Sequence, residues 1–424
     1  MTSLAIIGTG IAGLGCAHFL HQRFDLMVFE QNDYPGGHTN TIEAFEAGRP
    51  VPIDTGFMVF NHVTYPLLTR LFRELEVAIK PTNMSFSVQH VPTGLEYNGG
   101  SLNLLFAQRR NLLRPRYWRM LMQIDRFNRE AVPAINEVQY SRMSLRDYVA
   151  ARGYGHDMLH LFVLPMGCAV WSTPPDQMLD FPAVTLLRFW HNHGMLGLHN
   201  QHAWFTVEGG ARSYVRKLTA PFQDRVQLGA RVVRVRREPG RAFVTTDDGV
   251  CRPFDKVILA CHADQALALL ADPTALESRL LREFKYQPNT VTLHTDDSLM
   301  PRLRRCWASW NYRLDADADG QLLPTTHYWM NRLQGVSPGV NYFVSLNCHD
   351  RIAPGKVVRR IEYAHPLFNL AAIDAQAALP KLNQSGPGQS TYYAGAWFKH
   401  GFHEDGLASA LASAQAVTGE PLWT

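Results

Sequence analysis

The distribution of apolar residues at the start of the chain predicts a strand, a helix and a second strand. Residues 4–7 form a short apolar run, residues 14–20 repeat apolar positions at the period of a helix, and residues 26–29 form another apolar run. Glycines fill the turn between the first run and the helix. This order predicts a β-α-β unit, in which the N-terminus of the helix can bind a phosphate group.

The glycines of this turn have the spacing of a dinucleotide-binding motif. Gly8 suits the tight turn, Gly10 lets the backbone approach a pyrophosphate, and Gly13 lets the helix pack closely on the strand. Glu30 ends the second strand, where an acid can accept hydrogen bonds from a ribose. An ordinary glycine-rich turn would not explain Glu30, so we expect dinucleotide binding. The motif alone does not separate NAD from FAD.

The same patterns continue along the chain and predict further elements. Residues 226–235 and 242–246 alternate like strands, and residues 255–261 read as a buried strand. Residues 392–397 read as a strand that enters a glycine turn, and a helix rich in small residues follows. The segments between these pieces carry two predicted helices, 103–127 and 144–164, and three predicted strands, 290–294, 326–329 and 341–346.

Composition excludes several classes of protein. The chain has 424 residues, of which 46% are hydrophobic and 18% charged, as in a soluble globular enzyme. The net charge of +4 does not indicate a nucleic-acid partner. The six cysteines are scattered, which favours a reduced cytoplasm over a disulfide framework or a zinc site. No leader pattern and no apolar run of membrane-spanning length is visible, so we expect a cytoplasmic protein.

Residues beyond the first motif carry a resemblance to a known superfamily. A second glycine pair, Gly36 and Gly37, follows Glu30, and Asp54-Thr55-Gly56 comes after a predicted hairpin. Together with the C-terminal strand, turn and helix, these segments resemble the flavin amine oxidase and carotenoid desaturase superfamily. His38 stands where that superfamily usually has arginine.

The resemblance implies FAD as the cofactor, and it implies a role for each matching segment. The glycine pair would pass the pyrophosphate, the C-terminal helix would reach the isoalloxazine, and the backbone at Val232 or Val233 would contact the adenine. No cysteine lies in residues 349–424, so we expect noncovalent FAD. The residues expected to contact FAD are Gly8, Gly10, Ile11, Ala12, Gly13, Glu30, Gln31, Gly36, Gly37, His38, Thr39, Thr55, Gly56, Val233, Gly395, Asp405, Gly406, Leu407 and Ser409.

The predicted fold class is α/β, with a Rossmann-like FAD-binding domain of the glutathione-reductase and amine-oxidase type and an interleaved α+β substrate domain. The FAD-binding domain would be discontinuous and would comprise residues 1–80, 205–290 and 388–424. The substrate domain would comprise residues 81–204 and 291–387 and would place a sheet against helices.

Two departures from the superfamily pattern argue against an amine substrate. Classical amine oxidases place a lysine near flavin N5, and Thr290 takes that position here. The acidic residue expected after the C-terminal alanine and glycine is also missing, and Trp397 follows Ala396 instead. Aromatic residues are dense in the substrate half, and they favour an apolar pocket for an acyl chain or an isoprenoid. Structural core is the ordinary role of such residues.

A subfamily resemblance points in the same direction. Residues 307–312 (Trp-Ala-Ser-Trp-Asn-Tyr) resemble a bacterial group of FAD-dependent oxidoreductases whose members are linked to cyclopropane- or methyl-fatty-acid synthesis. We therefore expect oxidation of a hydrophobic substrate, with a modified fatty acyl chain as the leading hypothesis. Oxidation of amines or porphyrinogens, a flavin-dependent mutase or isomerase, and a flavoprotein that only binds or senses remain alternatives.

Three residues of the C-terminal turn are candidates for the chemistry. His400 and His403 flank Gly401 and Phe402, and a histidine near a flavin can accept a proton during C–H oxidation. Trp397 would stack or form a pocket wall. His400 and His403 also have the spacing of metal ligands, but the flavin turn explains them better, and we expect no metal. Cys168 has no visible catalytic partner and is expected to be a buried structural thiol.

One basic stretch can contact a membrane. The stretch from Arg109 to Arg119 holds five arginines among leucines and aromatic residues. A solvated helix face is the ordinary explanation of such a pattern. If the substrate is a lipid, peripheral docking on an anionic membrane explains it better.

Overall fold

A parallel five-stranded sheet is built from segments that are far apart in the chain. The computed structural model describes residues 1–197, 202–316, 319, 322–384 and 388–423. The strands of the parallel sheet, in spatial order, are β10 (Val226–Gln227), β2 (Asp25–Phe29), β1 (Ser3–Ile7), β14 (Lys256–Leu259) and β20 (Thr391–Tyr393). The first strand is central because its residues are apolar on both faces and are almost fully buried.

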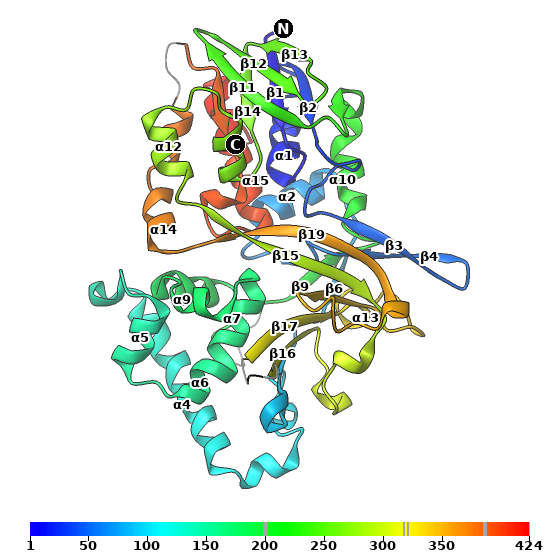
Figure 1. Cartoon of the computed structure of the whole chain (residues 1–424), viewed down its shortest axis with the longest axis vertical. Helices are drawn as coiled ribbons and strands as arrows, with labels where there is room; N and C mark the ends of the chain where they lie inside the picture. The colour runs from blue at the N-terminus through cyan, green and yellow to red at the C-terminus, as the bar shows by residue number, and fades with distance from the viewer. Residues whose placement is uncertain (198–201, 317–318, 320–321, 385–387, 424) are drawn as a thin grey trace.

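Helices α1 (Ile11–Leu20) and α15 (His403–Thr418) pack against each other beside this sheet (Figure 1). Small residues permit the close approach. A Cβ on Gly15 would lie 2.9 Å from the Cβ of Ala410, and a Cβ on Gly406 would lie 2.7 Å from Cγ2 of Ile11. The C-terminal helix is therefore held against the glycine turn at the start of the chain. Other helices of this region are α2 (Pro66–Glu74), α10 (Arg212–Thr219), α11 (Ala263–Leu269) and α12 (Ala275–Leu281).

The predicted strand over residues 226–235 is two strands. The chain leaves β10 through a turn at Gly229, whose φ of +65° suits glycine, and begins β11 at Val232. This second strand joins a separate antiparallel sheet. Its three strands are β11 (Val232–Glu238), β12 (Arg241–Thr246) and β13 (Cys251–Phe254).

A seven-stranded sheet organises the other half of the molecule. Its order is β19 (Val357–Leu367), β15 (Lys285–His294), β18 (Phe343–Leu346), β17 (Leu322–Trp329), β16 (Trp310–Ala316), β7 (Phe86–His90) and β8 (Leu95–Asn98). The long strands β15 and β19 cross between the two halves of the molecule (Figure 1). The three strands predicted for this half form, and β15 and β17 extend beyond the predicted residues.

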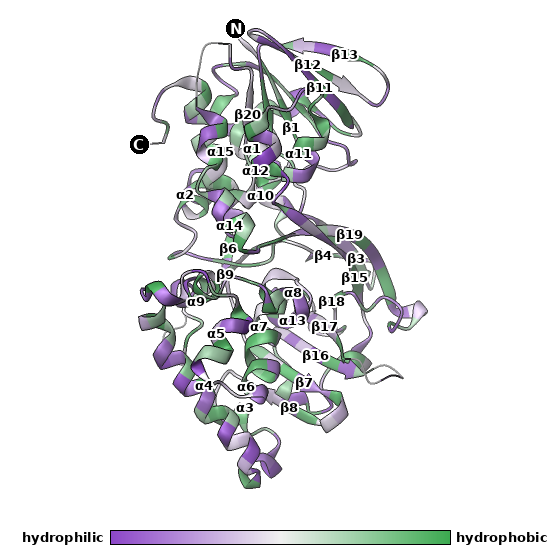
Figure 2. Ribbon diagram, turned by 60° about the vertical axis from the view of Figure 1, so that its left-hand side comes forward, coloured by the Kyte–Doolittle hydropathy of each residue, from purple (hydrophilic) through white to green (hydrophobic). Residues whose placement is uncertain are grey.

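Helices cover one side of this sheet, as Figure 2 shows. They are α4 (Pro115–Ala134), α5 (Leu145–Arg152), α6 (His156–Met158), α7 (Leu164–Trp171), α8 (Pro175–Leu179) and α9 (Ala183–Asn192). Shorter elements complete the chain and are α3 (Leu102–Leu105), α13 (Met330–Leu333), α14 (Leu370–Gln376), the hairpin β3 (Thr41–Glu46) and β4 (Arg49–Asp54), and a small sheet of β5 (Phe60–Asn61), β9 (Trp204–Val207) and β6 (Ile79–Thr82).

Both predicted long helices are interrupted, so those predictions were wrong in extent. Residues 103–127 form α3, a 3₁₀ turn over Arg109–Leu113 and the first part of α4. Arg114 is extended (φ −102°, ψ 106°) because the following Pro115 disfavours the helical conformation in the residue before it. Residues 144–164 break at Gly153, which has a φ of +64° and ends α5.

No helix among the described residues is long and apolar enough to span a lipid bilayer.

Candidate active site

A cavity of about 2000 Å³ connects the two halves of the molecule. Pockets for drug-sized ligands usually occupy about 300–1,000 Å³. This cavity therefore has room for a large cofactor and a second molecule. One end is lined by the glycine turn, Glu30, the second glycine pair and the C-terminal turn, and the other end is lined by the seven-stranded sheet and the helices α3, α4, α7 and α9.

Two of the three motif glycines are required by the protein itself. Gly8 has a φ of +105°, and a Cβ on it would lie 2.7 Å from the carbonyl oxygen of Ala260. A Cβ on Gly13 would lie 1.9 Å from the carbonyl oxygen of Gly8. Gly10 is different because a Cβ there would meet no protein atom within 4 Å, and its φ of −63° suits any residue. Gly10 lines the cavity at the N-terminus of α1, so the space in front of it is open to a ligand.

Glu30 is buried and lines the cavity, with hydrogen bonds that fix both carboxylate oxygens. Oε2 accepts from the amide of Thr9 at 3.0 Å and from its hydroxyl. Oε1 accepts from the amide of Asn32 at 2.9 Å and from its side chain at 2.8 Å. The carboxylate is therefore preorganised at the end of β2, and a bound ribose would share these acceptor oxygens with Thr9 and Asn32.

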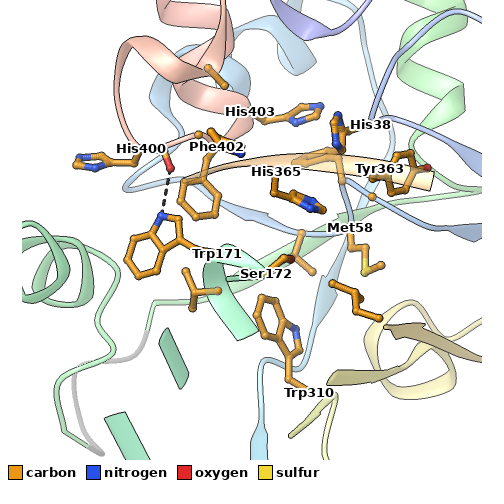
Figure 3. Close-up of a pocket in the computed structure, with 18 of the residues that line it drawn as sticks. His38, Met58, Trp171, Ser172, Trp310, Tyr363, His365, His400, Phe402 and His403 are labelled. Atoms are coloured by element: carbon orange, nitrogen blue, oxygen red, sulfur yellow. Dashed lines mark hydrogen bonds between the residues drawn. The ribbon is translucent and has the colours of Figure 1, made fainter. Parts of the chain in front are cut away.

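His38 is the buried polar group that best marks a ligand position. Its Nε2 atom is buried without a hydrogen-bond partner, and the ring lines the cavity. The ring centroid lies 5.3 Å from that of His365 (Figure 3). It lies 6.1 Å from that of His262. Burial, with His262 nearby, lowers the pKa of His38 to about 4. At neutral pH this ring is therefore uncharged, and its other nitrogen donates to the backbone at Ala364, so Nε2 can accept a hydrogen bond from a ligand.

The ring of His403 is held on one face and at its edge. Its Nε2 atom lies 2.9 Å from the hydroxyl of Thr39 and 2.9 Å from that of Tyr214, and its ring stacks on Phe57 with centroids 3.7 Å apart. Burial lowers the pKa of His403 to about 3. The ring lines the cavity as an ordered, uncharged group.

His400 faces a different part of the cavity. Figure 3 shows its ring directed away from His38, His365 and His403. Its carbonyl oxygen accepts from Nε1 of Trp171 at 3.3 Å, which ties the C-terminal turn to α7. Burial lowers the pKa of His400 to about 4, so this ring is also uncharged at neutral pH.

Four predicted cofactor contacts in the C-terminal segment shape the turn and do not line the cavity. Asp405 accepts from the amides of His400 and Phe402, and Ser409 accepts from the amide of Gly395 at 2.8 Å. Gly406 packs on α1, and Leu407 is fully buried in the core. These four residues position the segment from behind the cavity wall, and their contact with FAD stays a prediction.

Trp397 combines the predicted wall position with a core role. It lines the cavity, yet its indole N–H donates to the carbonyl of Cys261 at 3.1 Å and its ring packs on Phe284. Of the two valines predicted to offer their backbone to the adenine, Val232 lines the cavity and Val233 has an exposed side chain. The pairing of β11 with β12 shifts register between Val232 and Arg234, so the regular alternation of side chains is interrupted there.

The remaining predicted residues divide between the cavity wall and its support. Gly13 and Thr39 lie behind the wall. The predicted residues that line the cavity are Gly8, Gly10, Ile11, Ala12, Glu30, Gln31, Gly36, Gly37, His38, Thr55, Gly56, Gly395, Trp397, His400 and His403.

Sequence reasoning missed the contribution of β19 and of the turn after β14. Tyr363 and His365 come from β19, and His262 follows β14, where it stacks on Tyr286 with centroids 4.3 Å apart. These residues surround His38, although they lie more than 200 positions away in the chain. Tyr363 and His365 lie two positions apart, so a strand would place both on one face, and this spacing could have identified them as a pair. The sequence did not indicate that this face lines the cavity.

The end of the cavity away from the glycine turn is lined mostly by apolar side chains. On the α7 side it is lined by Phe162, Met166 and Val170, which recur every four residues, and on the sheet side by Trp310 and Tyr328. Other apolar residues that line this end are Met84, Phe86, Tyr97, Leu104, Leu105, Phe106, Leu121, Ile124, Trp171, Phe189 and Leu346.

Thr290, the position of the superfamily lysine in our alignment, does not face the cavity. Its hydroxyl donates to Glu362 at 3.1 Å, and its amide donates to the side chain of Asn347. The β15 residues that line the cavity are Tyr286, Pro288 and Val291. Within the described part of the chain, no lysine lines the cavity.

The thiol of Cys168 is buried, and burial raises its pKa to about 12. Within the residues that the structure describes, no group of three or more histidine, cysteine, aspartate or glutamate side chains is placed to hold a metal ion.

Comparisons with known proteins agree with this geometry. Residues 11–343 match the family model of flavin-containing amine oxidoreductases. No curated protein sequence matches the chain. Three similar solved structures are cyclohexylamine oxidase from Brevibacterium oxydans (15% identity, 99% of both chains, TM-score 0.68), a putrescine oxidase triple mutant (12%, 99% of both chains, 0.70) and a CLA-producing fatty acid isomerase from P. acnes (16%, 99% of this chain and 98% of that one, 0.65). At these identities the likeness confirms the predicted fold class.

Proposed function

This chain belongs to the flavin-containing amine oxidoreductase family, and we propose that it oxidises a long hydrophobic substrate, with a fatty acyl chain as the leading candidate. The family and its fold make the chain an FAD-dependent oxidoreductase. The identity of the substrate is the part that we propose.

The residues at the glycine end of the cavity fit FAD. The open space at Gly10, the ordered acceptor oxygens of Glu30 and the unpaired Nε2 of His38 suit a pyrophosphate, a ribose and a further polar contact. When bound, FAD supplies a two-electron acceptor at its isoalloxazine ring. We propose that it is held noncovalently, because the C-terminal segment that would face the ring has no cysteine.

The observation that carries the substrate proposal is the composition of the cavity wall. The end away from the glycine turn is lined mainly by aliphatic and aromatic side chains, and no lysine is among its described lining residues. The polar side chains at this end include Asn83, Ser85, Asp125, Asn128, Arg129 and Arg332. A primary amine or polyamine is charged at neutral pH, and an apolar wall does not compensate its loss of water. An acyl chain releases water from its own surface and from the wall, which favours binding.

In this proposal, residues of the cavity orient the substrate, and one of them accepts the proton that the substrate releases on oxidation. The walls from α7 and the seven-stranded sheet hold the acyl chain and exclude water, and Trp397 forms part of the wall near the C-terminal turn. His400 and His403 are candidates for accepting a proton, because both are uncharged at neutral pH. His400 is the freer of the two, since Nε2 of His403 is already held by Thr39 and Tyr214.

One similar structure favours a second candidate function. The CLA-producing fatty acid isomerase shares the fold, so we also consider isomerisation of a double bond in an acyl chain. An oxidation would leave a product two hydrogens lighter than the substrate. An isomerisation would leave its mass unchanged.

The test combines anaerobic flavin bleaching with mass spectrometry. Fatty acids dispersed in micelles, primary amines and polyamines are offered in turn to the purified yellow protein. We expect bleaching at 450 nm by an acyl substrate, a product lighter by two hydrogens and negligible bleaching by amines. Fast bleaching by an amine would overturn the substrate proposal and restore amine oxidation, and an acyl product of unchanged mass would favour the isomerase.

A further inference from the structure

An apolar patch lies at the end of the molecule farthest from the parallel sheet. It consists of the exposed side chains of Leu102, Leu112, Leu113, Trp118 and Met122, which we call the apolar tip. These residues belong to α3, the 3₁₀ turn before α4, and the first two turns of α4, at the lower end of the molecule in Figure 2. Leu113 is 88% exposed, and contiguous exposed apolar residues of this kind usually mark a binding surface.

Contacts within the segment hold the apolar tip in a defined conformation. The indole N–H of Trp118 donates to the carbonyl of Leu112 at 2.9 Å, and its ring packs on Phe106 with centroids 5.0 Å apart. Pro115 begins α4 directly after the 3₁₀ turn and fixes the direction of the helix. The exposed side chains are therefore presented by an ordered support.

Arginines surround the apolar tip. Arg109, Arg110, Arg114, Arg116 and Arg119 are all exposed. Arg116 pairs with Asp157, whereas the other four form no ion pair with a carboxylate in the part of the chain that the structure describes. Arg109, Arg110 and Arg114 make hydrogen bonds to uncharged acceptors, namely Asn103, Gly94 and Asn111. The positive charge of this surface is thus largely uncompensated.

The apolar tip is continuous with the cavity. Leu102, Trp118 and Met122 are exposed and also line the cavity. From there the apolar lining continues through Leu105 and Ile124 toward Phe86 and Met166. A chain that enters between α3 and α4 would meet apolar side chains from the surface to the interior.

We propose that the apolar tip and its arginines dock on an anionic lipid bilayer and that the substrate passes from the bilayer into the cavity at Leu102, Trp118 and Met122. This proposal rests on the proposed function for its substrate, but docking itself does not. Leucine and tryptophan side chains enter the interface of the bilayer, and the arginines contact anionic headgroups. The mouth of the cavity then opens toward the lipids.

Vesicle flotation of the intact flavoprotein tests the docking. Vesicles of phosphatidylcholine alone and vesicles with 30% phosphatidylglycerol are compared at low and high salt. We expect binding to the anionic vesicles, weakened by salt. Each arginine replaced by alanine at positions 109, 110, 114 and 119 should weaken binding about fivefold. Leu113→Ser should also weaken it, because this side chain would leave the interface.

Matched controls lie elsewhere on the surface. Val138 is 87% exposed, so Val138→Ser makes the same kind of change as Leu113→Ser outside the apolar tip. Arg234→Ala and Arg241→Ala remove exposed arginines from β11 and β12 at the opposite end. These control variants should bind vesicles as the unchanged protein does. An equal loss of vesicle binding in the tip and control variants would overturn the proposal, and so would a lack of binding to anionic vesicles. If the protein binds an acyl carrier protein through the apolar tip and does not bind vesicles, the surface belongs to that partner.

A second measurement separates this proposal from the proposed function. Flavin bleaching by fatty acid in detergent micelles does not require a bilayer, so the tip variants should keep it. Bleaching of the flavin by the same acid within anionic vesicles should slow in the tip variants alone. Vesicle binding without any acyl bleaching would retain the docking surface and reject the substrate.

Discussion

The three glycines of the first turn do different work, and a pair of substitutions can separate them. Gly10→Ala should leave the fold stable and lower FAD affinity by tenfold or more, because its Cβ meets no protein atom and occupies the ligand's approach. Gly13→Ala should destabilise the protein, since its Cβ would overlap the carbonyl of Gly8. Thermal unfolding and flavin titration of the apoprotein check both. Full FAD occupancy in Gly10→Ala would contradict the cofactor site.

Glu30 offers a graded test of ribose binding. Hydrogen bonds to a charged group contribute about 1.5–3 kcal/mol, so Glu30→Ala should weaken FAD binding by tenfold or more. Glu30→Gln keeps one acceptor oxygen and should lie between Glu30→Ala and the unchanged protein. Unchanged affinity in both variants would show that Glu30 only fixes the turn through Thr9 and Asn32. Titration of the apoprotein with FAD gives the order.

At this scale the sequence predicted residues whose role depends on local backbone. Gly8, Gly10 and Glu30 line the cavity as expected, because a strand, turn and helix fix their positions relative to one another. Asp405 accepts a hydrogen bond within the C-terminal turn, and the side chain of Val233 is exposed. The periodicity of short segments does not show which face of an element meets the cavity. His365 was missed because only tertiary pairing brings β19 beside His38.

At the scale of elements, α7 offers a test of the acyl-chain proposal. Met166 and Val170 lie one turn apart and face the cavity. Met166→Trp should narrow the apolar end and shorten the chain that fits. We expect KM to rise more for long fatty acids than for short ones, with FAD binding unchanged because the glycine end is untouched. A series of chain lengths provides the internal control, and an equal effect on every length would contradict the assignment.

The ends of the helices depend on single proline and glycine residues, which the apolar pattern of the segment does not reveal. The apolar pattern of residues 103–127 is helical, but the conformation of Arg114 is set by Pro115. The break at Gly153 depends on a left-handed residue, which the helical pattern does not register. The long strands were predicted only in part: β15 was expected over residues 290–294, the second half of its length, and β19 was not predicted.

At the scale of the molecule, sequence reasoning assembled the parallel sheet from three distant segments but could not give the strand order or the cavity. The order β10-β2-β1-β14-β20 depends on which buried strand meets which, and many apolar strands are interchangeable by pattern. The cavity exists because β15 and β19 hold the two halves around it. Its concentration of buried histidines is likewise a property of the whole fold.

Buried histidines, six of which line the cavity, predict how the flavin-free protein responds to acid. Seven have pKa values lowered by burial to about 3 or 4: His38, His193, His262, His294, His365, His400 and His403. In the unfolded chain each titrates near 6.5. As pH falls below about 6.5, the unfolded chain binds protons that the folded protein does not, so stability falls until the pH reaches the folded values. We expect Tm to drop between pH 7 and pH 5.

Two buried carboxyls act in the opposite direction. Burial raises the pKa values of Asp54 and Asp405 to about 6, so these groups take up protons in the folded protein first and stabilise it as pH falls from 7 toward 4. Each histidine or carboxyl contributes at most about 1.4 kcal/mol per pH unit, and the histidines are more numerous, so their loss should prevail. His365→Gln removes one contributor and should make the fall in Tm shallower, measured by scanning calorimetry at pH 7, 6 and 5. A Tm that rises on acidification would show that the carboxyls dominate and that the histidines gain protons without opening the fold.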